Sequence, residues 1–365
     1  MAPLAPDSAG RLDKLRRFMK RQDLQGIVIG AAVNVRYLTG FTGDSTFALL
    51  GTDEALLVSD GRYSEQLAQE CPDWPCEIRP PSLPLIEAVA RALQHLGWRR
   101  LGFESHRLTV AEWLHLQDRL PEATWCPLAS AVEDIRVVKD AYEIAYIREA
   151  VQTAEKAFQE WLGQVESTAT EKELADHLET ALRRHGAQSS SFPIIVASGT
   201  HSALPHARPR PVPVADGDWL LVDWGAVCHG YHSDLTRILI ARTISAKLEE
   251  VRAWVREALE RGLQAARPGA RASDVDSAVR RTLAEAGYDR FFCHGTGHGL
   301  GLEIHEAPFL RPGHDTLLQP GMVFTIEPGV YIPGWGGVRL EEDILVTTEG
   351  CQVLSQLDWR LKARG

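Results

Sequence analysis

Hydrophobic and polar positions follow two different periods along residues 1–131. Leucine and methionine recur at helical spacing near the start, and residues 85–97 repeat that spacing. Short apolar runs at residues 25–30, 47–50 and 54–60 have the length of buried strands. Helical and strand-like segments therefore alternate, which predicts an α/β domain over residues 1–131.

A long helix is predicted to begin after Asp140. The side chain of Asp140 can cap this helix, and Glu143 is the reciprocal partner of a capping box. Apolar residues then follow at helical spacing as far as Leu162. We therefore place a domain boundary just before this helix, with the second domain over residues 132–365.

One order of elements occurs twice in the second domain. Each copy has a capping pair, an amphipathic helix, a glycine stop, a strand and a Gly-Thr-His sequence, with one extra glycine in the second copy. The capping pairs are Thr170–Glu173 and Ser273–Asp276, and the strand segments are residues 191–201 and 291–298. This repeated order predicts a domain built from two related halves.

Composition narrows the class of protein. The chain has 365 residues and a net charge of -10, which argues against binding to nucleic acid or to an anionic membrane surface. No apolar run is long enough to span a membrane, and the opening residues lack the apolar run of a signal peptide. Six cysteines are scattered without a metal-binding pattern, so we expect reduced thiols and a cytoplasmic location.

Two aspartates mark the first segment with candidate chemistry. Residues 219–240 are predicted to form a β-hairpin in which Asp223 and Asp234 are equally distant from the Cys228–His229 step. Directly opposed residues lie roughly 4.5–5.5 Å apart, and two carboxylates at that distance repel each other unless a cation lies between them. The alternative is that one or both aspartates lie at solvated turn ends.

Three histidines and four glycines crowd into residues 294–306. A phosphate-binding loop is excluded, because Leu300 stands where the dinucleotide motif needs glycine and no lysine follows. A single histidine more often packs or hydrogen-bonds than binds metal. Three histidines near candidate carboxylates favour a metal site, with His298 as ligand and His294 and His305 facing the substrate.

The segment 324–346 supplies two further carboxylates. Glu327 follows an apolar run and precedes a Pro-Gly step, so a simply solvated side chain is not expected. Strand alternation places Glu341 on the same face as Arg339, which could hold a carboxylate in position. Glu342 and Asp343 are then solvated or supporting residues. A charged strand end without metal is the alternative.

Together these segments offer four carboxylates and one imidazole. Four negative charges would offset two divalent cations, which can activate a water molecule for nucleophilic attack. The ligand set therefore favours hydrolysis.

The motifs resemble those of the pita-bread metallopeptidases, a superfamily that includes methionine aminopeptidase, Xaa-Pro aminopeptidase, prolidase and creatinase. The segments VDWGA, HSDLTR, HGTGHGLGLEIHE, TIEPGVY and GVRLEEDILV occur in the family's order. Residues 34–45 and 58–66 are similar to the extra N-terminal domain of the Xaa-Pro aminopeptidase and prolidase branch. The resemblance implies a creatinase-like α/β N-terminal domain followed by an α+β pita-bread catalytic domain.

The resemblance also assigns roles. It implies that the metal ligands are Asp223, Asp234, His298, Glu327 and Glu341. Glu327 would also transfer the proton, and His206 and His305 would stabilise the oxyanion. His294, Tyr331 and Arg339 would contact substrate or support the ligands. We expect two divalent ions, with manganese favoured over cobalt, zinc or iron, and a homodimer.

Phe309 bears on the choice of substrate. Some dipeptidases of this family carry an arginine four residues after the equivalent of His305, and that arginine pairs with the dipeptide's free carboxylate. Phe309 stands there in this chain, although Arg311 could substitute. We therefore predict an Xaa-Pro aminopeptidase acting on short peptides with proline second, with a prolidase as the alternative. A non-catalytic binding protein and a creatinase-like hydrolase are further alternatives.

Overall fold

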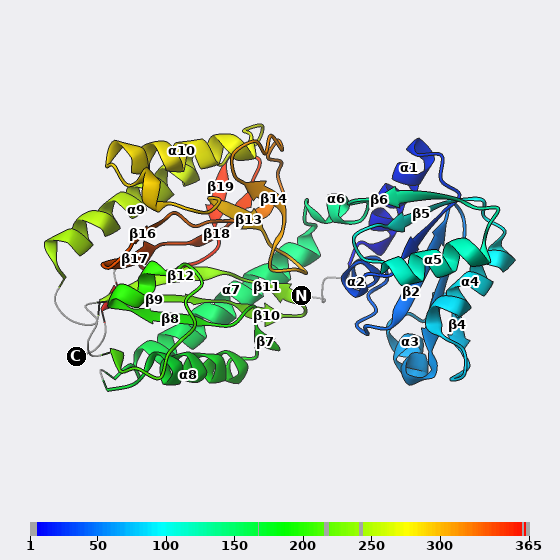
Figure 1. Cartoon of the computed structure of the whole chain (residues 1–365), viewed down its shortest axis with the longest axis horizontal. Coiled ribbons are helices and arrows are strands. Elements are labelled where there is room, and N and C mark those ends of the chain that lie inside the picture. The colour runs from blue at the N-terminus through cyan, green and yellow to red at the C-terminus, as the bar shows by residue number, and fades with distance from the viewer. Residues whose placement is uncertain (1–5, 167, 215–218, 241–243, 360, 363–365) are drawn as a thin grey trace. The chain divides into compact units, whose positions relative to one another are not determined.

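The chain forms two compact units, residues 1–136 and 137–365, coloured blue to cyan and cyan to red in Figure 1. This computed structural model describes residues 6–166, 168–214, 219–240, 244–359 and 361–362. The first unit ends slightly later than the predicted boundary at 131/132. The physical reason is that a short helix, α6 (Glu133–Arg136), belongs to it: the Arg136 guanidinium is buried and donates to Asn34 Oδ1 at 2.8 Å.

The first unit is the α/β domain that the hydrophobic pattern predicts. Its six-stranded sheet has the order β4-β3-β2-β1-β5-β6 and mixes parallel and antiparallel pairs. The strands are β1 (Gly26–Ile29), β2 (Thr46–Gly51), β3 (Ala55–Asp60), β4 (Cys76–Arg79), β5 (Arg100–Glu104) and β6 (Thr124–Leu128). The other helices are α1 (Ser8–Arg21), α2 (Ala32–Thr39), α3 (Ser64–Glu70), α4 (Leu85–Leu96) and α5 (Val110–Arg119). Apolar residues of α4 and α5 pack in one cluster with those of the sheet.

The described part of the second unit has four long helices and several sheets, whose strand pairs are antiparallel except for β12 with β20. The helices are α7 (Ala141–Leu162), α8 (Glu171–Arg184), α9 (Ala246–Ala265) and α10 (Ala272–Glu285). One sheet has the order β20-β12-β9-β8, built from β8 (Ile195–Ser198), β9 (Trp219–Trp224), β12 (Leu235–Ile240) and β20 (Leu361–Lys362). Another has the order β14-β13-β15-β18-β19, built from β13 (Gly297–Gly299), β14 (Glu306–Leu310), β15 (Val323–Ile326), β18 (Glu342–Val346) and β19 (Cys351–Val353). The smaller pairings involve β7 (Ser189–Ser190), β10 (Ala226–Cys228), β11 (Tyr231–His232), β16 (Gly329–Ile332) and β17 (Gly336–Arg339).

The second unit repeats one arrangement of elements. Two packed helices, α7 and α8, precede the strand order β8-β9-β12, and α9 and α10 precede the order β13-β15-β18.

The capping pair Thr170–Glu173 is present, with each side chain accepting from the other's backbone. The second predicted capping pair is wrong. Helix α10 begins at Ala272, where the Asp274 carboxylate accepts the N–H of Arg271 at 3.0 Å, and Asp276 instead turns into the core.

Both strand segments of the repeat are shorter than predicted. Within 191–201 only β8 is a continuous strand, and within 291–298 the strand begins at Gly297. Glycine explains the second case. A Cβ added at Gly297 would lie only 1.9 Å from the carbonyl oxygen of Thr325, so the absence of a side chain lets the backbone approach β15 closely here.

The hairpin of residues 219–240 forms, but its predicted register is wrong. Asp223 pairs with Thr236, and Asp234 precedes the first residue of β12. The turn centres on His229 and Gly230, whose φ angles of 49° and 75° are both positive, as a tight two-residue hairpin turn requires. Because the centre moves by one residue, the two aspartates lie diagonally on one face instead of directly opposite.

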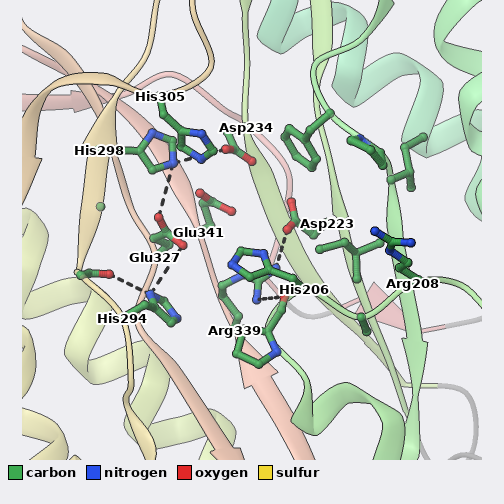
Figure 2. Close-up of a pocket in the computed structure, with 18 of the residues that line it drawn as sticks. His206, Arg208, Asp223, Asp234, His294, His298, His305, Glu327, Arg339 and Glu341 are labelled. Atoms are coloured by element: carbon green, nitrogen blue, oxygen red, sulfur yellow. Dashed lines mark hydrogen bonds and ion pairs between the residues drawn. The ribbon is translucent and has the colours of Figure 1, made fainter. Parts of the chain in front are cut away.

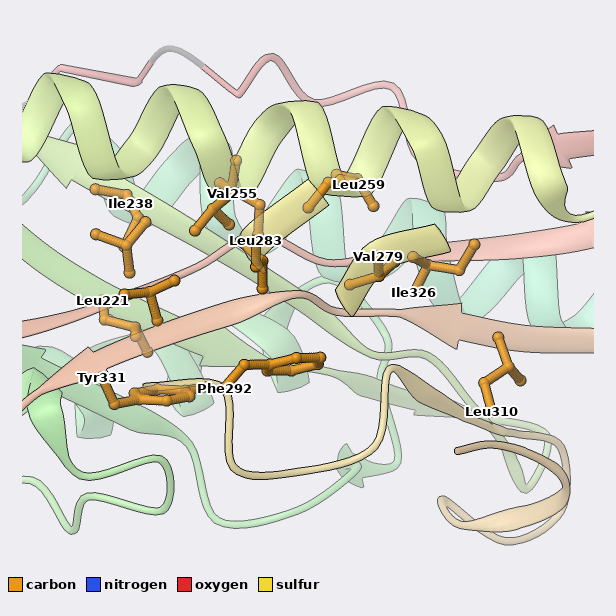
Figure 3. Close-up of a cluster of buried hydrophobic side chains, with 14 of the residues drawn as sticks. Leu221, Ile238, Val255, Leu259, Val279, Leu283, Phe292, Leu310, Ile326 and Tyr331 are labelled. Carbon is orange, nitrogen blue, oxygen red and sulfur yellow. The ribbon is translucent and has the colours of Figure 1, made fainter. Parts of the chain in front are cut away.

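A large apolar cluster lies behind the strands that carry the candidate ligands. It joins the inner faces of α9 and α10 to strands of both sheets, as Figure 3 shows with Val255, Leu259, Val279 and Ile326. Every one of these four side chains is fully buried. Burial at roughly 25 cal/mol per Å² of apolar surface is the main force that holds the two sheets and helices together. The polar side chains on the strand ends are thereby set on a rigid frame.

Candidate active site

Five segments distant in sequence bring the predicted ligands to one cavity of about 570 Å³. Asp223 lies on β9, Asp234 just before β12, and His298 on β13. Glu327 directly follows β15, and Glu341 directly precedes β18. All five line this cavity, and Figure 2 shows Asp234, His298, Glu327 and Glu341 close together.

The distances within this group fit a metal centre. The Nε2 atom of His298 lies 3.6 Å from Asp234 Oδ2 and 3.5 Å from Glu327 Oε1. Ligand atoms of Asp234, His298 and Glu341 all lie within 4.8 Å of one another. Burial lowers the pKa of His298 to about 4, so its imidazole is neutral at pH 7. Neutral imidazole is the form that binds metal.

The carboxylates carry like charges in a buried setting. Burial raises the pKa of Asp234 well above its usual value, and repulsion from Glu341 and Asp223 adds to the shift. Burial likewise raises the pKa of Glu341, and it raises that of Glu327 to about 8. The buried Asp223 Oδ1 has no hydrogen-bond partner among the described residues. Divalent cations would neutralise these charges and occupy the unpartnered oxygen, so the donor set fits them.

Arg339 holds one side of the centre in place. Its Nη2 contacts Asp223 Oδ2, and its Nη1 donates to Tyr331 Oη at 2.8 Å. Its Nε donates to Thr236 Oγ1 at 3.0 Å, and that hydroxyl donates to Glu341 Oε2 at 2.6 Å. One buried guanidinium therefore orients carboxylates from both sheets.

Three residues support the candidate ligands: Thr236 and Thr325, which the motifs do not single out, and Asp343, which strand alternation predicts as a solvated or supporting residue. Thr236 bridges Arg339 and Glu341, and Thr325 Oγ1 accepts the His298 N–H at 3.2 Å and donates to Glu327 at 3.3 Å. Asp343 is fully buried and accepts the Asp234 N–H at 2.9 Å. The available signal was strand alternation, because each of these residues stands two positions from a candidate ligand.

The remaining predicted residues surround the cavity. His294 accepts from or donates to Tyr331 Oη at 2.9 Å, and its Nδ1 lies 3.9 Å from Glu327 Oε2. His206 and His305 both line the cavity and are exposed. The imidazole rings of His298 and His305 are 4.3 Å apart edge to face. Glu342 turns away from the cavity and pairs with buried Arg237 at 2.8 Å.

Two family models match the chain. The model of metallopeptidase family M24 matches residues 145–348, and the model of the creatinase/prolidase N-terminal domain matches residues 11–138. The chain belongs to metallopeptidase family M24. The M24 match spans all five candidate ligand positions.

Similar proteins cover nearly the whole chain. An Xaa-Pro dipeptidase of Pyrococcus furiosus is 32% identical over 352 residues, which cover 96% of this chain and 99% of that protein. The solved structure of an Xaa-Pro dipeptidase from Bacillus anthracis has a TM-score of 0.93 and 37% identity, covering 98% of this chain and 99% of its own. An X-Pro aminopeptidase structure from Thermotoga maritima has a TM-score of 0.88 and 33% identity, covering 94% and 99%.

These matches confirm the fold predicted from the motifs. This M24 protein has a creatinase-like N-terminal domain and a pita-bread catalytic domain, and it is a peptidase. Its family is one of metal-dependent enzymes, and the group of Asp234, His298 and Glu341 is a candidate metal site. None of the helices in the described part of the chain could cross a membrane.

Removing divalent metal from this M24 protein is expected to lower its melting temperature. Repulsion among the buried carboxylates returns when the cations leave. A ligand present at a hundred times its dissociation constant stabilises by about 2.7 kcal/mol, which corresponds to roughly 5–10 °C for a domain of this size. Differential scanning fluorimetry with and without a chelator measures the shift. An unchanged melting temperature, with metal loss verified by elemental analysis, would contradict this account of the cluster.

Proposed function

We propose that this protein is an Xaa-Pro dipeptidase that uses two divalent ions. The observation that carries the proposal is that the cavity containing the candidate ligands is also lined by two exposed arginines, Arg208 and Arg311. In a dipeptide, the residue after the scissile bond carries a free carboxylate. A longer peptide has a peptide bond at that place instead. Arginine binds that group with charge-assisted hydrogen bonds. The Pyrococcus and Bacillus relatives named as Xaa-Pro dipeptidases support the same choice.

Arg311 is the stronger candidate for binding the carboxylate. Phe309 occupies the place of the arginine found in some dipeptidases and lies opposite His298 across the β13–β14 pair. The Arg311 guanidinium lies 5.1 Å from the centroid of the Phe309 ring, and its Nε donates to His314 Nε2 at 2.7 Å. These contacts stabilise the side chain and leave the terminal nitrogens, which have no partner among the described residues, for a ligand.

The chain's own residues suit hydrolysis of a proline peptide bond. We assign metal binding to the five predicted ligands. Two divalent ions held there would activate water and polarise the scissile carbonyl. Glu327, whose pKa burial raises to about 8, would accept and return the proton. A bound cation would oppose that shift. His206 and His305 would donate hydrogen bonds to the oxyanion, and His294 and Tyr331 would contact the substrate.

The sequence alone favoured an Xaa-Pro aminopeptidase, and the comparisons fit the dipeptidase alternative better. The aminopeptidase keeps one specific observation in its favour, because apolar Phe309 makes no bond to a carboxylate. The Thermotoga maritima relative named as an X-Pro aminopeptidase agrees with it. Manganese as the metal, a homodimer and a cytoplasmic location also stay predictions.

A comparison of three substrates tests the function. Arg311 should make the enzyme prefer an Xaa-Pro dipeptide over its C-terminal amide and over the matched Xaa-Pro-Xaa tripeptide. A charge-assisted hydrogen bond contributes about 1.5–3 kcal/mol, so kcat/KM should differ by roughly ten- to a hundredfold. Arg311→Ala should remove the preference, and Arg311→Lys should retain part of it.

The results distinguish a dipeptidase from an aminopeptidase, and Arg311 from Arg208 as the residue that binds the carboxylate. Equal cleavage of dipeptide and tripeptide by the wild type would favour the aminopeptidase. An unchanged preference in Arg311→Ala, together with a lost preference in Arg208→Ala, would assign carboxylate binding to Arg208. No cleavage of any of the three substrates by the metal-loaded protein would refute both functions.

A further inference from the structure

One wall of the cavity is a loop that contains none of the candidate metal ligands. Residues 202–209 begin in the last turn of the 3-10 helix η2 (Gly199–Ala203) and run to the segment that leads towards β9. Pro205, His206, Ala207, Arg208 and Pro209 from this loop line the cavity. Figure 2 shows Arg208 on the opposite side of the view from His294 and His298, with His206 between them. The position of this loop therefore determines where the side chains of His206 and Arg208 lie.

The loop has few internal hydrogen bonds to set that position. The Leu204 N–H donates to the His201 carbonyl at 3.1 Å, and the Ala207 N–H donates to the Leu204 carbonyl at 3.1 Å. The side chains of His206 and Arg208 have no hydrogen-bond partner among the described residues. Near its middle, the Pro205 carbonyl accepts from Arg339 Nη1 at 3.3 Å, a long contact. Two further contacts hold the loop: the Gly337 N–H donates to Ser202 Oγ at 2.7 Å, and Ala207 is buried in the apolar cluster. The other restraints lie at its two ends.

Both ends converge on one buried carboxylate, that of Glu171. Its side chain is fully buried at the first turn of α8. Before the loop, it accepts the Ser198 N–H at 2.9 Å, the Ser198 hydroxyl at 2.7 Å and His201 Nδ1 at 2.9 Å. After the loop, it accepts the backbone N–H of Arg210 at 3.0 Å and two guanidinium nitrogens of Arg210 at 3.0 and 3.1 Å.

This carboxylate is more than a helix cap. Thr170 already caps α8, and its reciprocal partner is the exposed Glu173. A buried carboxylate is stable only when hydrogen bonds and charge replace its hydration. Although burial opposes ionisation, hydrogen bonds from Arg210 and Ser198 hold the pKa of Glu171 below its usual value. The ionised group therefore ties the two ends of the loop to α8.

The second half of the unit contains a similar arrangement. Asp276 of α10 is also buried, and it accepts the Thr296 N–H at 3.3 Å and the Thr296 hydroxyl at 2.9 Å. It also accepts Arg280 Nε at 2.8 Å, and Arg280 Nη2 donates to the His294 carbonyl at 2.5 Å. In each half, a carboxylate of the second helix and a nearby arginine hold a segment that lines the cavity.

We propose that Glu171 is a positioning residue that fixes the loop 202–209, and with it His206 and Arg208, at the substrate side of the cavity. The proposal rests on the proposed function in that His206 and Arg208 are taken to contact substrate. Glu171 itself does not line the cavity, so it acts through the loop. Asp276 serves the opposite wall and is not part of this test.

Hydrogen exchange tests the structural part without any substrate. Glu171→Gln replaces one acceptor oxygen by an amide that cannot accept from Arg210 or His201. Amide exchange in residues 198–214 should become faster in this variant, while exchange in β13, β15 and the first unit stays as in the wild type. Unchanged exchange in 198–214 would overturn the proposal. Glu173→Gln, which alters only the exposed cap, is the control and should leave this region unchanged.

Kinetics test the functional part. In metal-loaded Glu171→Gln, kcat/KM for an Xaa-Pro dipeptide should fall roughly ten- to a hundredfold, the scale expected for displaced catalytic groups. Metal content should equal that of the wild type. In a His206→Ala background, the same change should lower kcat less than twofold, because the loop no longer carries the oxyanion donor. A full additive loss in that background, or loss of metal, would show a general structural role instead.

The outcomes also separate this proposal from the proposed function. Glu171→Asp keeps the charge and should recover part of both the exchange protection and kcat/KM. It also serves as the second variant if Glu171→Gln does not fold. A wild type that cleaves no Xaa-Pro peptide would refute the proposed function, while the exchange measurement would still decide whether Glu171 fixes the loop.

Discussion

Asp234→Ala is expected to abolish metal binding and peptidase activity while leaving the fold intact. Asp234 Oδ2 lies 3.6 Å from His298 Nε2, and its ligand atoms form a compact group with those of His298 and Glu341. Removing it takes away one of the five predicted metal ligands. The fold should survive, because the backbone N–H of residue 234 can still donate to Asp343 and no apolar core is emptied.

Three measurements check this expectation. Elemental analysis should find little bound metal, activity should fall to background, and circular dichroism should match the wild type. Without metal, the variant should be at least as stable as the metal-free wild type, since the buried Asp234 carboxyl group, whose pKa burial and repulsion from Glu341 and Asp223 raise, is gone. Asp118→Ala, at an exposed position of the first unit, is the control. Two bound metals with near-normal turnover would remove the central assignment.

His206→Ala should lower kcat about a hundredfold, the scale of a lost oxyanion donor. His206 lines the cavity and is exposed to it, and it is not among the candidate ligands. Metal content should therefore equal that of the wild type, and KM should change much less than kcat. Steady-state kinetics together with elemental analysis measure the two effects.

The control for this prediction is His177→Ala, an exposed histidine on the outer face of α8. It should leave kcat unchanged. Loss of metal together with the His206 imidazole would mean that His206 belongs to the metal centre and that the roles proposed for the histidines need to be exchanged.

Local sequence signals predicted the elements well where a short-range interaction decides the structure. The capping boxes at Asp140–Glu143 and Thr170–Glu173 form as predicted, because both partners lie within one helical turn. The predicted box at Ser273–Asp276 fails because another local cap and a tertiary contact replace it. Asp274 offers an equivalent local cap, and a tertiary partner, Thr296, draws Asp276 inward.

The hairpin register shows a limit of symmetry arguments. Equal spacing about Cys228–His229 was consistent with a direct Asp223–Asp234 pair, yet the pair is diagonal. The deciding property is backbone conformation: His229 and Gly230 both take positive φ, and glycine does so without a steric penalty. A histidine in that conformation is uncommon, so equal spacing alone predicts a turn one residue too early.

The sequence by itself determined the two-domain architecture, the family and the five candidate ligands that line one cavity. Each of those side chains stands in a short motif whose chemistry is specific, so its neighbours in sequence identify it. The tertiary structure alone decided which groups orient them. The contacts of Thr236 with Glu341, of Asp343 with Asp234 and of Glu171 with Arg210 join segments far apart in the chain. Such contacts depend on how sheets and helices pack, and packing distances are not written in local sequence.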